Sequence, residues 1–279
     1  MVLFNSSGSE KPLYIAVVIA TKDRAKLLTE RAIPSVFAQH QHPNLVVIVD
    51  DSPPFSRHKT TQVVTAAATR SPDIEFRLLV NQRAAGASGA WNTALHFLAE
   101  RCEPSFTAVF FLDDDDEWLP NHIQNCIKAL QTRHLSAVAT GMVRVTEPSD
   151  NGRDQFPPEL WIDDLFLVGN PHIQASNLAV RLDILQQAGL FNEALLSCTD
   201  RDLCLRMLAV TGFTYGNVNT VTVRHFAESG RPRLSTPGSR AKHRGLDEFW
   251  RIYRHRMTTS QHTQFLKRCK DVFSWSPPD

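Results

Sequence analysis

The first 120 residues alternate between short apolar runs and longer stretches in which apolar residues recur every three or four positions. The apolar runs predict buried β-strands at residues 14–20, 45–54, 74–80 and 107–112. Stretches with helical spacing lie between them, at residues 25–39 and 88–100. Strands that are apolar on both faces and separated by helices predict an α/β fold with a mainly parallel sheet covered by helices.

Helical spacing occurs again at residues 121–132 and at residues 241–257. The second of these helices is amphipathic, with basic side chains opposite an apolar stripe made of Leu246, Phe249, Trp250, Tyr253 and Met257. A stripe of this kind packs against the rest of its domain, or a basic helix of this kind rests on an anionic membrane. The pattern alone leaves both interpretations open.

Composition limits the class of protein. The chain has 279 residues, of which 42% are hydrophobic and 21% charged, which is enough for one large or two small globular domains. No apolar run is long enough to span a membrane, and the N-terminus has neither a basic segment before its apolar stretch nor a small-residue cleavage site. The five cysteines lack CxxC spacing, so neither a disulfide framework nor a zinc site is predicted, and we expect a cytoplasmic protein.

Charge is spread unevenly along the chain. The formal net charge is +1, but residues 224–270 contain twelve Lys or Arg residues against three acidic ones. A basic region on a nearly neutral protein favours an anionic partner, such as a diphosphate, a nucleic acid or an acidic membrane surface.

Carboxylates follow three of the predicted strands at the point where each strand ends. They are Asp23, the pair Asp50 and Asp51, and the run from Asp113 to Asp116. Ligands of open α/β sheets bind beyond the carboxyl ends of the strands, so these groups should meet at one edge. Crowded carboxylates repel one another unless a cation lies between them, and oxygen ligands suit Mg²⁺ or Mn²⁺. The alternative is that each group only caps a helix or lies in a solvated turn.

Five segments in a fixed order carry a family resemblance: IATKDR, VVIVDDS, NQRAAGASGAWNTAL, FFLDDDDEW and CTDRDLCLR. From about Tyr14 to His225 the chain resembles the family 2 glycosyltransferases, which have the GT-A fold. The resemblance implies transfer of a sugar from a nucleotide diphosphate sugar, most commonly a UDP-sugar, with inversion at the anomeric carbon. It also implies a GT-A domain over residues 1–240, with a donor half at 12–118 and an acceptor half at 119–240. Residues 241–279 then form a basic helical extension.

The resemblance assigns the first three segments to the donor. It implies that Thr21 and Asp23 contact the nucleoside and that Asp51 reads the base, with Asp50 nearly as good a candidate. Arg83 is implied near the phosphates, and Asn92 is a weaker candidate in the same region. The family usually has Gly-Ser after the second carboxylate, whereas this chain has Ser-Pro-Pro, at 52–54.

The aspartate run resembles the family's metal and diphosphate site. Asp113 and Asp115 match the Asp-x-Asp pair, which implies that Asp115 binds Mn²⁺ or Mg²⁺ and that Asp113, with Asp114, holds the donor. His225 follows a predicted strand and resembles a histidine that the family places near the metal. It is equally well explained as a structural histidine.

The segment CTDRDLCLR resembles the part of the family that carries the catalytic base. Asp200 takes that position, and Thr199 replaces the glutamate that the family usually has before it. The alternative role for Asp200 is a helix N-cap. Asp202 and Arg206 are four residues apart on the predicted helix, which indicates a structural ion pair.

The acceptor is the least predictable feature. The resemblance places His172, Gln174 and Ser176 on the acceptor side, and each is equally well explained as a satisfied polar group of a strand. The irregular stretch 146–162 is predicted to be a mobile acceptor loop. Arg231 and Arg233 lie in a segment predicted to close over the diphosphate. A glycan, a lipid-linked sugar, a small molecule, a protein and even a nucleic acid remain open as acceptors.

Two other classes of function share some of these features. A sugar nucleotidyltransferase has a similar sheet, but it needs a glycine-rich loop after the first strand, and IATKDRAKLL has no glycine. A non-catalytic relative would bind a nucleotide sugar or another anion without turnover. Product analysis distinguishes sugar transfer, pyrophosphate exchange and the absence of both.

Overall fold

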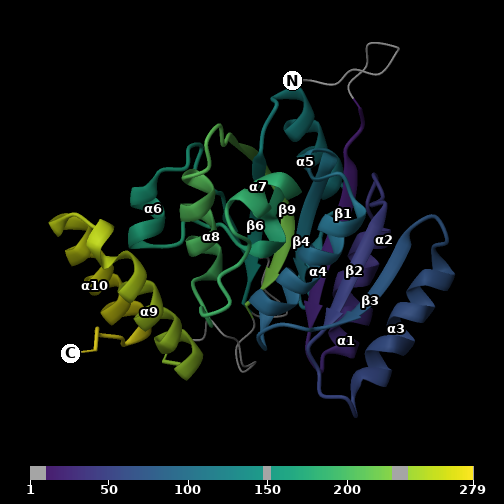
Figure 1. Cartoon of the computed structure of the whole chain (residues 1–279), viewed down its shortest axis with the longest axis horizontal. Helices are drawn as coiled ribbons and strands as arrows, with labels where there is room; N and C mark the ends of the chain where they lie inside the picture. The colour runs from purple at the N-terminus through teal and green to yellow at the C-terminus, as the bar shows by residue number, and fades with distance from the viewer. Residues whose placement is uncertain (1–10, 147–151, 228–237, 279) are drawn as a thin grey trace.

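One mixed sheet runs through the protein. The computed structural model describes residues 11–146, 152–227 and 238–278. Within these ranges the strand order is β3-β2-β1-β4-β8-β6-β9-β5, and β7 pairs with the edge of β6 (Figure 1). The strands are β1 (Tyr14–Thr21), β2 (Leu45–Asp50), β3 (Glu75–Val80), β4 (Thr107–Asp113), β5 (Glu117–Trp118), β6 (Ala137–Val145), β7 (Arg153–Gln155), β8 (Leu178–Arg181) and β9 (Tyr215–Phe226).

The prediction of a mainly parallel sheet is confirmed for the first half of the chain only. Strands β1 to β4 are parallel, whereas β8 runs antiparallel to both β4 and β6, and β9 runs parallel to β6. The segment before β8 already lies at the carboxyl end of β4, where Ser176 accepts a hydrogen bond from the Asp113 N–H at 3.1 Å. From that position β8 has only one way to enter the sheet, which is against the direction of β4.

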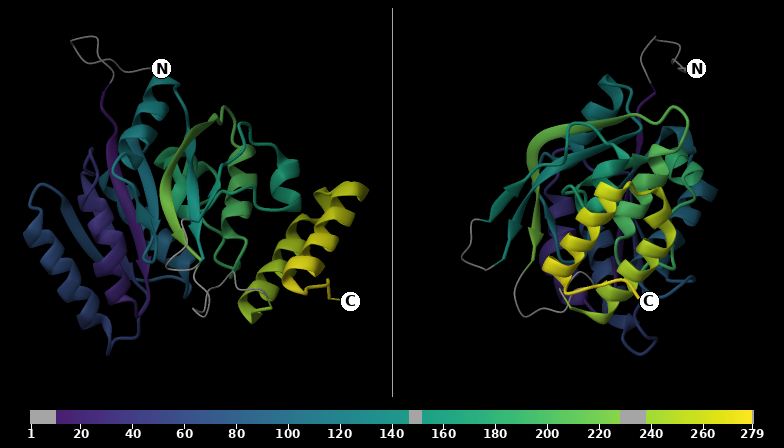
Figure 2. Two further views of the ribbon diagram at one scale, coloured as in Figure 1. Left: turned by 180° about the vertical axis from the view of Figure 1, so that it is seen from behind. Right: turned by 90° about the vertical axis from the view of Figure 1, so that its left-hand side faces the viewer.

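Helices cover both faces of the sheet, as Figures 1 and 2 show. They are α1 (Ala25–Leu27), the π turn η1 (Leu28–Ala32), α2 (Ile33–Phe37), α3 (Arg57–Arg70), α4 (Ala87–Arg101), α5 (His122–Thr132), α6 (Asp163–Val168), α7 (Leu182–Gln187), α8 (Thr199–Leu208), α9 (Arg240–Tyr253) and α10 (Thr259–Phe273). Short 3₁₀ turns lie at η2 (Pro104–Phe106), η3 (Ala175–Asn177) and η4 (Arg254–Arg256). The predicted helices at 25–39, 88–100, 121–132 and 241–257 are therefore present with small shifts at their ends.

Side chains of the buried strands pack into two separate apolar cores, one on each face of the sheet. Along β1, Ala16 and Val18 join one core, whereas Ile15, Val17 and Ile19 join the other. This alternation is what the two-residue period of a strand dictates when both faces are covered. The burial confirms the central strands β1, β2 and β4, whereas β3 lies at the edge of the sheet and has no buried residue, so the prediction of a buried strand there is wrong.

The C-terminal helices α9 and α10 pack together at the end of the molecule opposite β3 (Figures 1 and 2). The apolar stripe of α9 is buried in the same core as α6 and α8, through Leu246, Phe249, Trp250 and Tyr253. Buried Arg201 of α8 lies 4.0 Å above the Phe249 ring and donates to the carbonyls of Phe166 and Leu167. The stripe therefore packs against the rest of the chain, which is the first of the two interpretations.

Two further predictions about the chain can be compared with the structure. Among the described residues, no helix is both long enough and apolar enough to cross a membrane. All five cysteines are free thiols, as the absence of CxxC spacing predicts.

Candidate active site

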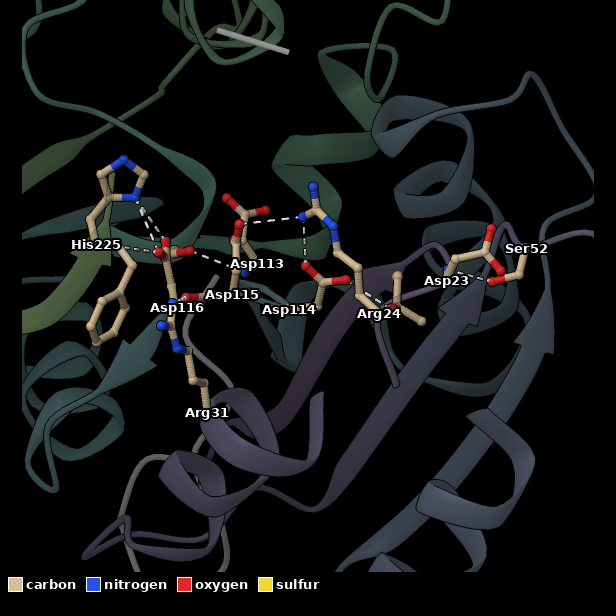
Figure 3. Close-up of polar contacts among 12 residues, drawn as sticks. Asp23, Arg24, Arg31, Ser52, Asp113, Asp114, Asp115, Asp116 and His225 are labelled. Atoms are coloured by element: carbon tan, nitrogen blue, oxygen red, sulfur yellow. Dashed lines mark hydrogen bonds and ion pairs between the residues drawn. The ribbon is translucent and has the colours of Figure 1, made fainter. Parts of the chain in front are cut away.

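Four consecutive aspartates turn at the carboxyl end of β4. Asp113 ends the strand beside Ala20 of β1, and the Asp116 N–H donates back to the Asp113 carbonyl at 3.1 Å. The turn points the four carboxylates in different directions, and Figure 3 shows Arg24 and His225 approaching them from opposite sides. The predicted gathering of acidic groups at this edge is therefore present.

Asp114 is held on the β1 side of the turn. Its carboxylate accepts from the Thr21 hydroxyl at 2.8 Å and from the Arg24 guanidinium at 3.0 Å. Burial raises the pKa of Asp114 to about 6, while Arg24 and Thr21 act in the opposite direction. Arg24 also lies 3.3 Å from Asp115, so its guanidinium contacts two of the four carboxylates.

Asp116 is fully buried on the opposite side of the turn. It accepts from the Phe226 N–H and lies 3.1 Å from His225 Nδ1. Burial alone would raise the pKa of Asp116, but His225 and hydrogen bonds from Ser176 and Phe226 bring that pKa below its ordinary value. His225 is therefore part of the aspartate cluster, with its Nδ1 directed at Asp116.

Three of the carboxylates fit a divalent cation. Asp113, Asp115 and Asp116 each offer an oxygen, and these oxygens lie within 4.8 Å of one another. Burial, followed by repulsion from Asp116, Asp115 and Asp200, raises the pKa of Asp113 well above its usual value. Hard oxygen donors crowded in this way suit Mg²⁺ or Mn²⁺, which would remove the repulsion. This set differs from the predicted pair, Asp115 and His225, because Asp116 lies between His225 and the other carboxylates.

Asp51 sits at the centre of a polar network at the end of β2. It accepts from Asn81 Nδ2 at 2.6 Å, from the Gly86 N–H at 2.9 Å and from Lys22 Nζ at 3.3 Å. Gly86 has a φ of 114°, a conformation that favours glycine and allows this N–H to face the carboxylate. The structure thus joins the predicted donor residue Asp51 to the start of α4.

Asp50 is more deeply buried than Asp51 and has an unsatisfied oxygen. Its Oδ1 accepts from the Ser52 N–H at 2.8 Å, whereas buried Oδ2 has no hydrogen-bond partner within the described residues. The departure from the usual Gly-Ser has a visible effect, because Ser52 Oγ accepts the Asp23 N–H at 2.7 Å. Asp23 has a positive φ of 54°, and its carboxylate accepts from Ser56.

Arg83 and Asn92 make contacts with the segment after α7. Arg83 forms an ion pair with Glu193. Asn92 donates to Glu193 at 2.8 Å and exchanges two hydrogen bonds with the backbone of Phe191, each 2.9 Å long. These contacts join Arg83 and α4 to the segment after α7, and no contact among the described residues joins Arg83 to the aspartate turn.

Asp200 lies in the first turn of α8. The N-cap of this helix is Cys198, with a φ of 65°, so the alternative role of Asp200 as an N-cap is wrong. Burial raises the pKa of Asp200 to about 6, and Lys242 and His225 oppose that shift. Because Asp200 in turn raises the pKa of Asp113, the two carboxyl groups lie within electrostatic reach of each other.

Asp202 has the structural role that the sequence predicts. It accepts from Arg206 at 2.6 Å and 2.9 Å through one oxygen, and from the Tyr253 hydroxyl at 2.7 Å through the other. The contact with Tyr253 ties α8 to the C-terminal helix α9. Both carboxylate oxygens are therefore occupied by the scaffold.

Lys242 of α9 is a site residue that the sequence reasoning missed. Its side chain is buried, with Nζ 3.5 Å from Cys198 Sγ and 4.3 Å from the centroid of the Phe273 ring. No carboxylate among the described residues lies within 4.0 Å of this ammonium, although it is the main cation acting on Asp200. The sequence did contain a sign of its burial, because Lys242 lies four residues before Leu246 and so falls on the buried apolar stripe of the helix.

The predicted acceptor residues lie on the segment that enters β8. Ser176 contacts the aspartate turn directly, through the Asp113 N–H and, by its carbonyl, Trp118 Nε1. His172 is exposed and has a φ of 63°, and Gln174 begins the 3₁₀ turn η3. The predicted loop at 146–162 contains β7, and Arg231 and Arg233 lie outside the described residues.

Solved structures resemble the whole chain. One is S. aureus TarS 1–349 in complex with UDP, with a TM-score of 0.64, 15% identity and coverage of 93% of this chain and 72% of that one. Another is a mannosyltransferase, PcManGT from Pyrobaculum calidifontis, in complex with GDP-Man and Mn²⁺. It matches with a TM-score of 0.60 and 18% identity, over 92% of this chain and 69% of that one. At these identities the likeness establishes the GT-A fold.

Curated relatives match a shorter part of the sequence. A UDP-Glc:alpha-D-GlcNAc-diphosphoundecaprenol beta-1,3-glucosyltransferase, WfgD of Escherichia coli, is 30% identical over 124 residues, which are 44% of each chain. The succinoglycan biosynthesis protein ExoW of Rhizobium meliloti is 29% identical over 42% of this chain and 34% of its own length. The matches thus span less than half of these relatives.

The family itself is shown by a longer match. The sequence model described as Glycosyl transferase family 2 matches residues 16–187, more than half of the chain, and covers β1 to α7 with the whole aspartate turn. The chain therefore belongs to glycosyl transferase family 2.

Proposed function

We propose that this glycosyltransferase moves a sugar from a UDP-sugar to an acceptor hydroxyl with inversion, in a reaction that depends on Mn²⁺ or Mg²⁺. The observation that carries the proposal is the cluster of Asp113, Asp115 and Asp116, whose oxygens lie within 4.8 Å of one another. Asp200 of α8 lies within electrostatic reach of Asp113. The choice of UDP is supported by the names of relatives, since TarS is solved with UDP and WfgD is a UDP-Glc enzyme.

The donor would lie across the carboxyl ends of β1, β2 and β4. Thr21, Asp23 and Asp51 would contact the nucleoside there, and the unsatisfied oxygen of Asp50 supports that residue as an alternative to Asp51. Asp113 and Asp115, with Asp116, would hold the cation. When bound, the cation supplies positive charge for the departing diphosphate.

Asp200 would act as the general base. It accepts the proton of the acceptor hydroxyl, whose oxygen attacks the anomeric carbon on the face opposite the diphosphate. The bond between that carbon and the diphosphate oxygen breaks as the new glycosidic bond forms. Asp200 can accept a proton only when ionised, and Lys242 and His225 favour its ionised form.

The proposed function also implies a division of the chain into a GT-A domain and a C-terminal extension. Residues 1–240 would form the GT-A domain, with the donor half at 12–118 and the acceptor half at 119–240, and residues 241–279 the helical extension. We retain a cytoplasmic location, with peripheral contact of the basic C-terminal region with an anionic surface, as part of the proposal.

Thermal unfolding in the presence of nucleotides tests the donor assignment. We expect UDP with Mn²⁺ to raise the apparent melting temperature, since a ligand that binds only the folded state stabilises it. GDP, CMP and dTDP with Mn²⁺, and UDP with EDTA, are the matched controls. Equal shifts for all nucleotides, or no loss of the UDP shift in EDTA, would contradict the donor or metal assignment. UDP binding without release of UDP from any UDP-sugar would favour the non-catalytic binding protein.

A further inference from the structure

A row of three basic side chains crosses three neighbouring strands beside the aspartate cluster. His225 of β9 is in register with Arg144 of β6, and Arg144 is in register with Arg153 of β7. Residues in register on adjacent strands project from the same face of a sheet, so these three side chains stand side by side. Asp154 comes one position after Arg153 and therefore projects from the opposite face.

Two more basic groups join this row from other elements. The pKa of His172 is lowered by its partial burial and then by repulsion from Arg153, Arg268 and Arg144. His172, in the segment before η3, therefore lies within electrostatic reach of Arg144, Arg153 and Arg268 of α10. Five separate parts of the chain contribute to this cationic surface.

The arginines of this surface have no acidic partner in the described structure. Among residues 11–146, 152–227 and 238–278, no ion pair or side-chain hydrogen bond involves Arg144, Arg153 or Arg268. Like charges directly opposite one another on paired strands destabilise a sheet. Some other exposed arginines are paired, for example Arg251 with Glu248 and Arg256 with Asp163.

A polar cavity lies at the far end of the cationic surface. It has a volume of about 410 Å³ and lies between α6 and α10, with Arg268 in its wall. Its other polar lining is Asn170, Thr258, Ser260, Gln261, Gln264 and Asp164, whose carboxylate accepts a hydrogen bond from Gln261 at 2.6 Å. Amide and hydroxyl groups of this kind hydrogen-bond to sugar hydroxyls. The surface thus leads from the aspartate cluster, through His225, to a cavity suited to a glycan.

We propose that this row is the binding site for a phosphate group carried by the acceptor, so that the acceptor is a phosphorylated glycan or polyol. The inference rests on the proposed function, because it places the acceptor beside Asp200 and the donor on the other side of the cluster. Charge complementarity favours a phosphate group as the occupant, because a guanidinium group binds two phosphate oxygens at once. A bound phosphate would also cancel the repulsion within the row.

Binding of glycerol phosphate tests the proposal without knowledge of the natural acceptor. The protein is first saturated with UDP and Mn²⁺, and the affinity for glycerol phosphate is then measured by calorimetry, with glycerol as the uncharged probe. We expect glycerol phosphate to bind and glycerol not to bind. Arg144→Gln and Arg153→Gln should each weaken binding about tenfold, as expected for the loss of a hydrogen bond to a charged group.

Arg254→Gln is the matched control, because Arg254 is exposed and lies outside the row. We expect it to bind glycerol phosphate as the parent does. Folding is checked by thermal unfolding, where the two row variants should be at least as stable as the parent, since each removes repulsion.

Three results would overturn the inference. They are no binding of glycerol phosphate, an equal loss in Arg254→Gln, or an equal loss of UDP affinity in the row variants, which would assign the row to the donor. The same experiment distinguishes a failure of the proposed function from a failure of the phosphate site. Failure of UDP to bind contradicts the proposed function, whereas binding of UDP without glycerol phosphate contradicts only the phosphate site.

Discussion

The Lys242 ammonium lies 3.5 Å from the Cys198 sulfur, at the N-cap of the helix that carries Asp200 two residues later. The lysine comes from α9, more than forty positions along the chain, and it is buried. A buried cation beside a buried carboxyl group favours the ionised form of the acid. The C-terminal helix thereby contributes to the electrostatics of the proposed base.

Replacing Lys242 should change the pH dependence of the reaction. Asp200 has a pKa of about 6 and acts only when ionised, so the rate should fall as pH falls through that value. Because Lys242 lowers this pKa, Lys242→Met should raise it and move the acidic limb of the rate profile to higher pH. The expected shift is on the order of one pKa unit, the effect of losing one nearby opposite charge. It is measured as the initial rate of UDP release from the UDP-sugar against pH.

Two further variants control this prediction. Lys242→Arg keeps the charge and should restore the position of the acidic limb. Lys267→Met removes a charge from an exposed position of α10 and should leave the profile as it is in the parent. An unchanged limb in Lys242→Met would show that the ammonium does not act on the base.

The role of Asp200 itself is tested by an isosteric change. Asp200→Asn cannot accept the proton of the acceptor, so transfer should fall on the order of 100- to 10,000-fold, the usual worth of a general base. UDP with Mn²⁺ should still raise the melting temperature as in the parent, because Asp200 is not in the carboxylate set at the end of β4. Near-normal transfer in this variant would remove Asp200 as the base.

The metal assignment depends on Asp115. Asp115→Ala removes one of three clustered carboxylates, and the Mn²⁺-dependent stabilisation by UDP should be lost. Asp154→Ala, at an exposed position of β7, is the matched control and should keep it. If Asp115→Ala binds UDP and Mn²⁺ as tightly as the parent, the cation is held elsewhere.

Much of the donor side could be predicted because it depends on local patterns. Continuous apolar runs define β1, β2 and β4, and the parallel arrangement brings their ends, with Asp51 and Asp113, to one edge. The pattern did not show that β8 runs antiparallel, because its direction depends on where the preceding segment contacts the aspartate turn. The helix α3 was also missed, since only Thr60, Val64 and Ala67 of its fourteen residues are buried.

Partners that are distant in sequence were harder to predict. The pairing of Arg24 with Asp114 and the burial of Asp116 against His225 each join residues about ninety or more positions apart. A sequence of four aspartates does not show which carboxylate faces an arginine, which faces a histidine and which face one another. The backbone turn sets the direction of each carboxylate, and the conformation of that turn is known only from the folded structure.

The position of α9 should depend on one small residue, Gly245. A methyl group at this position would lie 2.1 Å from Ser197 Oγ and 2.7 Å from the Ser197 backbone nitrogen, so α9 must move away from the start of α8. Gly245→Ala should therefore destabilise the protein by about 1–3 kcal/mol, as other overpacked sites do, and withdraw Lys242 from Asp200.

The expected signature combines two measurements. The melting temperature should fall, and the acidic limb of the rate profile should move to higher pH, as in Lys242→Met, while UDP binding is kept. Arg244→Ala, an exposed change in the same helix, should alter neither property by a comparable amount. A destabilised Gly245→Ala with the parent's pH profile would mean that the packing of α9 matters for stability alone, and that Asp200 does not depend on the C-terminal helix.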